Sequence, residues 1–147
     1  MDMANIILCD IDGTVADNSH RQHFLEGKKD WDGFFDALDL DEPIYEIINK
    51  MNDEHNQGRE IIFLTGRPER YRDPTENWLK QYFNFPLRVV MRPNDNKKNK
   101  LLTKKEMFEQ NFNIDEIFYV IDNDEDLLNM WTDMQLKVVG VTDIISQ

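Results

Sequence analysis

The sequence predicts an α/β protein with a doubly wound, three-layer fold, in which one parallel sheet lies between two layers of helices. Three observations support this class. Short apolar runs typical of buried strands alternate with amphipathic helical patterns along the whole chain. A length of 147 residues suits one domain with a full core, so we expect residues 1–147 to form a single domain. Polar side chains directly follow three of the strand-like runs, where parallel sheets of this kind hold ligands.

The first third of the chain contains a strand, an irregular insertion and a helix. Asn5–Asp10 is an apolar run that ends abruptly in Asp-Ile-Asp-Gly-Thr, which predicts a buried strand. Residues 17–40 are rich in His, Lys and aromatic residues without a clean period, and we expect them to form a small cap of loop and short helix. An i, i+3, i+4, i+7 pattern then predicts an amphipathic helix, entered through Asp41 and Pro43 and closed near Gly58, with core positions Ile44, Ile47, Ile48 and Met51.

The remainder continues the alternation of strands and helices. Asp73, Pro74 and Glu76 form a capping pattern that predicts a helix starting near Asp73. Asn94–Lys105 is rich in Asn and Lys and leads into a further helix. In order, the predicted elements are strand Glu60–Thr65, a helix with Trp78 and Leu79 on its core face, strand Leu87–Met91, helix Leu101–Phe112, strand Ile117–Ile121, a helix carrying Leu127, Leu128, Trp131 and Met134, and strand Lys137–Val141.

Composition narrows the classes of function. The net charge of −12 excludes a protein that grips a nucleic acid along its length, so any such contact should be local. The lone Cys9 excludes an internal disulfide and fits a reducing compartment. Cys9 is not expected to be a phosphatase nucleophile, because the arginine that such a thiolate needs a few residues later is replaced by Val15 and Ala16. With no long apolar segment or leader pattern, we expect a cytoplasmic protein without a membrane partner.

The strand ends carry the predicted chemistry. Asp10 and Asp12 flank the exit of the first strand beside Gly13, Thr65 ends the second strand, and Asp122 ends the fourth. Crowded carboxylates repel each other, and Mg²⁺ is the hard cation that oxygen ligands of this kind hold. Asp10 is then the candidate nucleophile for phosphorus, and Asp12 the candidate general acid and base. The alternative for Asp10-Ile-Asp-Gly-Thr is a solvated turn. A calcium loop at Asp122, Asp124 and Asp126 is set aside, because Leu127 stands where a glycine is required.

These motifs resemble those of the haloacid-dehalogenase-like (HAD) phosphatase superfamily. Asp10-Ile-Asp12-Gly13-Thr14-Val15 resembles its first motif, Thr65 its second and Asp122-Asn123-Asp124 its fourth. Within the superfamily, the sequence is similar to the 3′-phosphatase domain of phage polynucleotide kinase/phosphatase. That likeness is carried by Leu64-Thr65-Gly66-Arg67, Tyr71-Arg72, Trp78-Leu79, Lys104 ahead of Glu106-Met107-Phe108, and Met130-Trp131.

The resemblance implies roles for individual residues. Asp10 would be the nucleophile, Asp12 the acid and base, Thr65 a phosphate ligand, and Lys104 the cation beside nucleophile and phosphate. Asp10, Asp12, Asp122 and Asn123 would hold Mg²⁺, while Gly66, Arg67 and Arg72 would bind substrate. Two departures are that Asn123 replaces an expected aspartate, and that Lys100 replaces an acidic residue four positions before Lys104. Lys98, Lys100 and Lys105 therefore compete with Lys104 for its role.

The insertion offers further candidates. We interpret Phe34 and Phe35 as core residues and Arg21 as a substrate-binding residue, and leave His20 and Trp31 open between packing and contact with a base or sugar.

Three functions follow. The leading hypothesis is a Mg²⁺-dependent polynucleotide 3′-phosphatase acting through an aspartyl-phosphate, with a phosphorylated nucleic acid end as partner, and with a host cytoplasm as its location if the protein is viral. Because no Gly-x-x-x-x-Gly-Lys-Ser/Thr loop is present, we expect no kinase activity from this chain. The alternatives are a phosphatase of free nucleotides or other small phosphomonoesters, and a catalytically idle phosphate-binding module.

Overall fold

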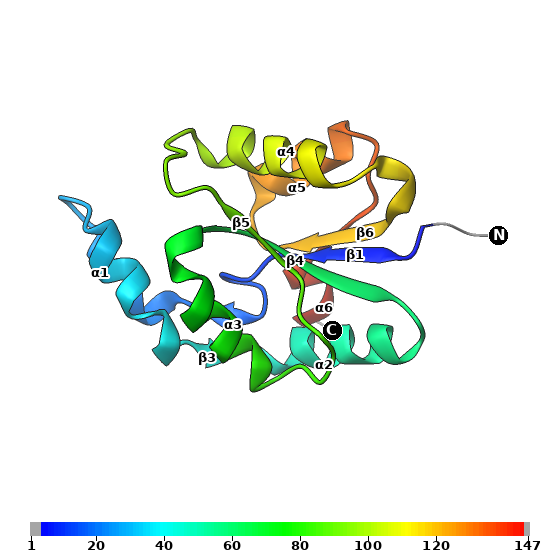
Figure 1. The fold of residues 1–147 in the computed structure, drawn as a ribbon, viewed down its shortest axis with the longest axis horizontal. Helices are drawn as coiled ribbons and strands as arrows, with labels where there is room; N and C mark the ends of the chain where they lie inside the picture. The colour runs from blue at the N-terminus through cyan, green and yellow to red at the C-terminus, as the bar shows by residue number, and fades with distance from the viewer. Residues whose placement is uncertain (1–3, 146–147) are drawn as a thin grey trace.

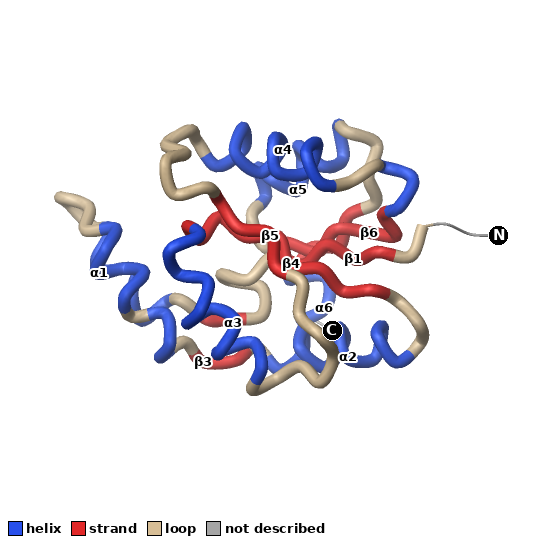
Figure 2. Tube along the Cα trace, viewed as in Figure 1, coloured by secondary structure: helices blue, strands red, loops and turns tan. Residues whose placement is uncertain are grey.

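Five parallel strands form the central layer of the protein. The structure, a computed structural model, describes residues 4–145, and its main sheet has the strand order β5-β4-β1-β6-β7. The strands are β1 (Ile6–Cys9), β4 (Glu60–Pro68), β5 (Val89–Arg92), β6 (Ile117–Asp122) and β7 (Val138–Gly140). Figures 1 and 2 show this sheet between two layers of helices. The predicted α/β class with a doubly wound parallel sheet is confirmed.

Each face of the sheet is covered by its own set of helices. One face packs on α2 (Tyr45–Asn56), α3 (Arg72–Lys80) and α6 (Val141–Ile145), and the other on α4 (Lys100–Asn111) and α5 (Glu125–Asp133). Successive side chains of a strand point to opposite faces, so Ile7 and Cys9 join the first core while Leu8 joins the second. Both faces are therefore buried, which explains why the strands read as continuous apolar runs rather than alternating ones.

Three local expectations differ from the structure. Helix α3 begins at Arg72 with Tyr71 as N-cap and no side-chain cap, because the 3₁₀ turn Glu69–Tyr71 supplies its first turn; Asp73 is not the N-cap. Strand β4 continues past Thr65 to Pro68 through a bulge. The last strand is shorter than predicted and runs directly into α6, where the Asp143 carboxylate accepts a bond from the Gly140 amide at 3.0 Å.

Residues 17–40 form short helices at the carboxyl edge of the sheet. They comprise the 3₁₀ helix Ser19–Leu25, α1 (Trp31–Asp36) and the 3₁₀ turn Leu38–Leu40. A small antiparallel pair, β2 (Ala16–Asp17) with β3 (Glu42–Pro43), joins the two ends of this segment. Figure 1 shows α1 standing beyond the ends toward which the strands run. Among the described helices, none has the length and apolar character needed to cross a membrane.

Candidate active site

The carboxyl ends of three neighbouring strands bring together the residues expected to do chemistry. Strand β1 lies between β4 and β6, at the point where the chain changes direction across the sheet. Asp10 follows β1, Thr65 lies in β4 and Asp122 ends β6. The turn after Asp10 is tight, since the carbonyl of Ile11 accepts the amides of Thr14, Val15 and Ala16 at 3.0–3.1 Å. This geometry turns the segment back over the sheet edge.

Gly13 is required in that turn for two reasons. Its φ is +80°, a region that side chains rarely adopt. A Cβ at this position would also overlap the side-chain amide of Asn123. Only glycine therefore lets the turn lie against the start of the segment that follows β6.

Asp10 is buried in contact with a single ammonium group. Its side chain accepts from Lys104 Nζ at 2.7 Å and from Thr14 Oγ1 at 3.2 Å, and the residue is 8% exposed. Lys104 Nζ also lies 3.3 Å from Asp122 Oδ2. Burial first, and then the charge of Asp122, raise the pKa of Asp10 to about 7 despite Lys104. Burial would lower the pKa of Lys104, but the two carboxylates outweigh it and raise that pKa above its ordinary value.

The structure separates Lys104 from the three other lysines considered for its role. Lys98 pairs with Glu106 at 2.7 Å, and Lys100 pairs with Asp124 at 2.6 Å. Lys105 is exposed on α4, whereas Lys104 on the same helix is 6% exposed and points at Asp10. Lys100 does not disturb Lys104, because it turns outward to the N-cap aspartate of α5. Asp10 and Asp122 together hold Lys104 in place of the missing acidic residue.

Oxygen atoms from two strands converge around the Asn123 side chain. Asp10 Oδ2, the carbonyl of Asp12 and Asp122 Oδ1 lie 3.1, 3.0 and 3.3 Å from one amide atom of Asn123. All three are acceptors, so we assign that atom as the amide nitrogen. Three hard oxygens facing one point are part of the octahedral set that Mg²⁺ prefers, so these residues fit the ion once the Asn123 amide rotates to present its oxygen instead of its nitrogen. Among residues 4–145, no three acidic, His or Cys side chains gather as a ready-made metal site.

Asp12 is clamped by two buried arginines. Its Oδ1 lies 2.6 Å from Arg21 Nη2 and 2.8 Å from Arg67 Nη2, and both guanidiniums are fully buried. The bulge in β4 directs Arg67 toward Asp12 and Thr75, whose hydroxyl accepts from Arg67 Nη1 at 3.1 Å. Burial would raise the pKa of Asp12, but the charges and hydrogen bonds of Arg67 and Arg21 outweigh it and hold that pKa below its usual value. The Asp12 side chain is still 23% exposed and so faces the site.

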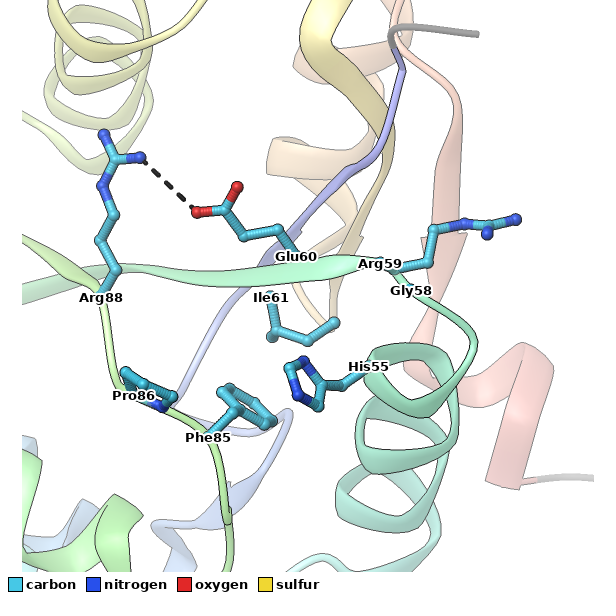
Figure 3. Close-up of a pocket in the computed structure, with 8 residues that line it drawn as sticks. All are labelled: His55, Gly58, Arg59, Glu60, Ile61, Phe85, Pro86 and Arg88. Atoms are coloured by element: carbon cyan, nitrogen blue, oxygen red, sulfur yellow. Dashed lines mark ion pairs between the residues drawn. The ribbon is translucent and has the colours of Figure 1, made fainter.

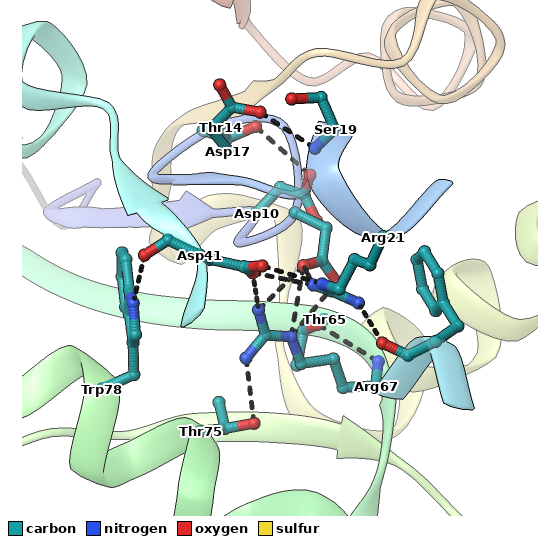
Figure 4. Close-up of polar contacts among 12 residues, drawn as sticks. Asp10, Thr14, Asp17, Ser19, Arg21, Asp41, Thr65, Arg67, Thr75 and Trp78 are labelled. Atoms are coloured by element: carbon teal, nitrogen blue, oxygen red, sulfur yellow. Dashed lines mark hydrogen bonds and ion pairs between the residues drawn. The ribbon is translucent and has the colours of Figure 1, made fainter. Parts of the chain in front are cut away.

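Asp41 bonds both arginines on the side away from Asp12. The sequence alone does not identify it as a site residue. Its carboxylate accepts from Arg21 Nε at 2.8 Å, Arg67 Nη2 at 3.2 Å and His20 Nε2 at 2.6 Å. Its carbonyl accepts from the indole of Trp78 at 2.9 Å. Figure 4 shows the arginines converging on Asp41 beside Trp78. No local pattern marks this role, since Asp41 before Pro43 reads only as a helix entry.

The four residues predicted to bind substrate lie in different surroundings. Every nitrogen of the Arg21 and Arg67 guanidiniums is hydrogen bonded within the protein, and the acceptors are Asp12, which is partly exposed, and the buried Asp41, Thr75 and Phe34 carbonyl. Arg72 lies away from the cluster, where it bonds Glu69 at 2.7 Å and the Val89 carbonyl at 3.0 Å. Gly66 does line the cavity that reaches Lys104. Thr65 is 1% exposed, and its hydroxyl accepts the Arg67 amide at 3.1 Å.

The ring side chains singled out in the 17–40 segment lie in three different surroundings. Phe34 and Phe35 are each 5% exposed, in agreement with their interpretation as core residues. Trp31 is 45% exposed and lines the cavity beside Lys104. His20 contacts Asp41, which makes it part of the polar network beneath Asp12.

A second cavity lies at the opposite, amino end of the sheet. It has a volume of about 330 Å³ and is walled by His55, Ile61, Phe85 and Pro86, with Arg88 and Glu60 4.0 Å apart at its rim (Figure 3). It contains none of the strand-end carboxylates, and its one ion pair is exposed. The chemistry is therefore at the carboxyl end.

Comparisons with known proteins identify the family of the chain. The family model for the polynucleotide kinase PNKP phosphatase domain matches residues 4–143. A protein of Autographa californica nuclear polyhedrosis virus, whose name describes a bifunctional polynucleotide kinase/RNA ligase, is 28% identical over 90% of this chain and 18% of its own length. In a Pnkp1/Rnl/Hen1 RNA repair complex, one chain superposes with a TM-score of 0.73 and 25% identity over 92% of this chain and 41% of that chain. A class C acid phosphatase from Bacillus anthracis with tungstate bound, 21% identical, shares the fold with a TM-score of 0.56 over 88% of this chain and 61% of that one.

Fold and site together define a phosphatase of the HAD type. More specifically, the chain belongs to the family of polynucleotide kinase PNKP phosphatase domains. It spans less than half the length of the polynucleotide kinase/RNA ligase and of the repair-complex chain that it matches.

Proposed function

We propose that this phosphatase is Mg²⁺-dependent and removes the terminal phosphate from the 3′ end of a nucleic acid through an aspartyl-phosphate on Asp10. The observation that carries the proposal is the pairing of buried Asp10 with Lys104 at 2.7 Å, directly beside the clamped carboxylate of Asp12. Catalytic roles for Asp10, Asp12, Thr65 and Lys104, and metal contacts from Asp10, Asp12, Asp122 and Asn123, form part of it.

The proposed reaction proceeds in two displacements. An Asp10 carboxylate oxygen attacks phosphorus, the bond to the ester oxygen breaks, and Asp12 gives that oxygen a proton. Asp12 then takes a proton from water, whose oxygen attacks the phosphoryl group and returns Asp10 as a carboxylate. Lys104 and the hydroxyl of Thr65 hold the transferring phosphoryl oxygens. Bound Mg²⁺ supplies positive charge that lets two anionic groups approach each other.

The arginine clamp gives Asp12 a pKa suited to both steps. Arg21 and Arg67 keep Asp12 ionised before substrate arrives, as a base requires. A phosphate dianion beside Asp12 opposes the arginines through like-charge repulsion and raises its pKa, so that Asp12 takes up the proton that it later donates. In this scheme Arg21 and Arg67 act through Asp12 and do not contact substrate.

Family membership supports the nucleic acid end as the substrate. Two of the relatives, the viral polynucleotide kinase/RNA ligase and the chain of the RNA repair complex, carry names that describe polynucleotide phosphorylation, RNA ligation and RNA repair. As part of the same proposal, residues 17–40 act as a small cap over the site, and the protein works in the cytoplasm. We also propose that this chain transfers no phosphate from ATP, because its 147 residues contain no phosphate-loop motif.

A matched set of substrates tests the proposal. Purified protein is assayed for phosphate release from 3′- and 5′-phosphorylated oligonucleotides and from 3′- and 5′-mononucleotides, each with Mg²⁺ or EDTA. We expect Mg²⁺-dependent release that is fastest from the 3′-phosphorylated oligonucleotide, and none from Asp10→Asn protein with a native circular dichroism spectrum. Equal activity in EDTA, activity in Asp10→Asn, or preference for 5′ ends would each refute a separate part of the proposal.

A phosphatase of free nucleotides is the second candidate. The net charge of −12 favours it slightly, because an acidic protein attracts a long polyanion poorly. Faster hydrolysis of mononucleotides than of oligonucleotides would support this candidate over the first.

A further inference from the structure

A cavity extends outward from the catalytic cluster between the cap segment and the loop after β5. It has a volume of about 550 Å³, and Lys104 and Gly66 form its inner end. Trp31 and Phe35 of α1 form one wall, and Pro93, Asn94 and residues 96–99 form the opposite one. A ligand whose phosphate lies at Asp10 therefore has a defined space for the next part of its structure.

The charge of this cavity is opposite to that of the protein. Of 17 basic residues in the chain, six line it, whereas no acidic residue within the described range 4–145 does. The six are Arg70, Arg92, Lys97, Lys98, Lys100 and Lys104. In a chain with a net charge of −12, this segregation makes a local anion-binding surface.

Three of the six cations are not engaged by a close carboxylate. Lys98, Lys100 and Lys104 each pair with an acidic side chain at 2.6–2.7 Å. Arg92 donates only to the Gly66 carbonyl, at 3.0 Å, and Lys97 has no ion pair among the described residues. Arg70 lies over the Tyr71 ring, and its carboxylate partner, Asp32, is exposed and 3.4 Å away. Arg70, Arg92 and Lys97 are therefore available to an anion.

Arg70 and Arg92 line the same cavity, and no carboxylate lines it between them. Burial first, and then the charge of Arg70, lower the pKa of Arg92. Two like charges beside a partly buried wall oppose each other, and an anion between them removes that cost. Tertiary structure maintains this arrangement by anchoring Arg92 to Gly66 of the catalytic edge.

The opposite wall presents a fixed aromatic face. The Trp31 ring, 45% exposed, packs edge-on against Phe34 at 5.8 Å and stacks with Phe35 at 6.0 Å. Its position is therefore set before any ligand binds. Aromatic faces held in this way stack on nucleobases without selecting among them.

We propose that Arg70, Arg92 and Lys97 form a second phosphate subsite, which binds the phosphodiester next to the terminal phosphate while Trp31 stacks on a base. The inference rests on the proposed function and narrows its substrate to a strand of at least two nucleotides. It explains how an acidic protein engages a nucleic acid end: the contact is confined to one cavity.

The length dependence of turnover tests the subsite. Rates are measured on a 3′-mononucleotide and on 3′-phosphorylated dinucleotide and pentanucleotide. We expect KM to fall about tenfold from mononucleotide to dinucleotide and little beyond. Because the dinucleotide has one phosphodiester that the mononucleotide lacks, its log KM should rise with log salt more steeply than that of the mononucleotide, by about 0.7. An active enzyme with equal kcat/KM for mononucleotide and dinucleotide would overturn the subsite and leave the phosphatase proposal intact.

Matched variants locate the contacts. Lys97→Gln, Arg70→Gln and Arg92→Gln should each reduce the preference for dinucleotide over mononucleotide by about three- to tenfold and lower the salt slope. Arg88→Gln, at the far cavity, makes the same charge change and should leave that preference as in wild type. Lys97 is exposed and unpaired among the described residues, so its replacement tests the idea even if Arg92→Gln disturbs Gly66. A preference that survives all three replacements contradicts the subsite.

Binding gives a readout that does not depend on turnover. Asp10→Asn protein is titrated against a fluorescently labelled, 3′-phosphorylated pentanucleotide by anisotropy. Lys97→Gln or Trp31→Ala in that background should weaken binding about threefold or more, whereas Arg88→Gln should not. The four proteins compared are Asp10→Asn alone and Asp10→Asn combined with each of the three further replacements. Equal affinity of all four for the pentanucleotide, or no binding by any of them, would refute the subsite, and this result does not require an active enzyme.

Discussion

Replacing Asp41 by Asn tests whether charge balance beneath Asp12 supports both stability and catalysis. Asp41 has no exposed side-chain surface, and it shares two fully buried arginines with Asp12. The amide keeps the shape but removes the charge, which leaves Arg21 and Arg67 with one carboxylate between them. Breaking a buried charge pair of this kind costs about 3–5 kcal/mol, a large part of the roughly 5–15 kcal/mol that stabilises a typical domain.

Thermal and urea unfolding measure that cost. For a domain of this size, the loss corresponds to a decrease in Tm of roughly 6–20 °C. Asp39→Asn is the matched control, because Asp39 lies exposed in the 3₁₀ turn that Asp41 follows as C-cap, and its replacement should change stability by less than about 0.5 kcal/mol. If Asp41→Asn and Asp39→Asn lower the free energy of unfolding equally, Asp41 does not stabilise the protein by balancing the buried charges of Arg21 and Arg67.

Catalysis provides a second readout of the same change. Without Asp41, both arginines act on Asp12 alone, favour its ionised form and make it a poorer acid. For folded Asp41→Asn protein, we expect kcat to fall about 10- to 100-fold on alkyl phosphates, whose leaving oxygen needs a proton, and much less on p-nitrophenyl phosphate, whose leaving group does not. An equal loss on both substrates would show that Asp41 does not act through Asp12.

Three further predictions concern the residues around Asp10. Lys104→Ala should reduce kcat by about 10²–10³-fold on any phosphomonoester, whereas Lys105→Ala, one position along α4, should stay near wild type. In EDTA, the Asp10 pKa of about 7 in the folded protein exceeds its pKa in the unfolded chain. Between about pH 4 and pH 7, the folded state therefore keeps a proton that the unfolded state has lost. The free energy of unfolding is then expected to fall as the pH rises through this range. Asp10→Asn removes this penalty, and its gain in Tm over wild type should be greater near pH 8 than near pH 5; an equal gain at both would contradict the shift. Gly13→Ala should cost about 1–3 kcal/mol and most of the activity, because it combines a φ of +80° with overlap on Asn123, whereas Gly27→Ala, where nothing lies within 4 Å, should cost only the strain of its positive φ.

The order of elements and the location of the site followed from local sequence. Asn5–Asp10 and Glu60–Thr65 are short apolar runs, and the helix at Ile44–Met51 has a clear period, so short-range pattern was sufficient. The carboxyl-edge rule then placed Asp10, Thr65 and Asp122 together. The start of α3 and the helix α6 were missed, because a preceding 3₁₀ turn and a five-residue helix leave little periodic signal.

By itself, the sequence determined the α/β class, the strand ends that meet and the carboxylates that form the candidate site. Only the tertiary structure decided which lysine faces Asp10, that Arg21 and Arg67 support Asp12 from below, and that Asp41 balances them. The reason is physical. Strand and helix patterns arise from neighbours a few residues apart, whereas the bond from Lys104 to Asp10 spans 94 positions and that from Arg67 to Asp12 spans 55. Such pairings depend on how buried charges find partners once the core has packed, and no local pattern records that choice.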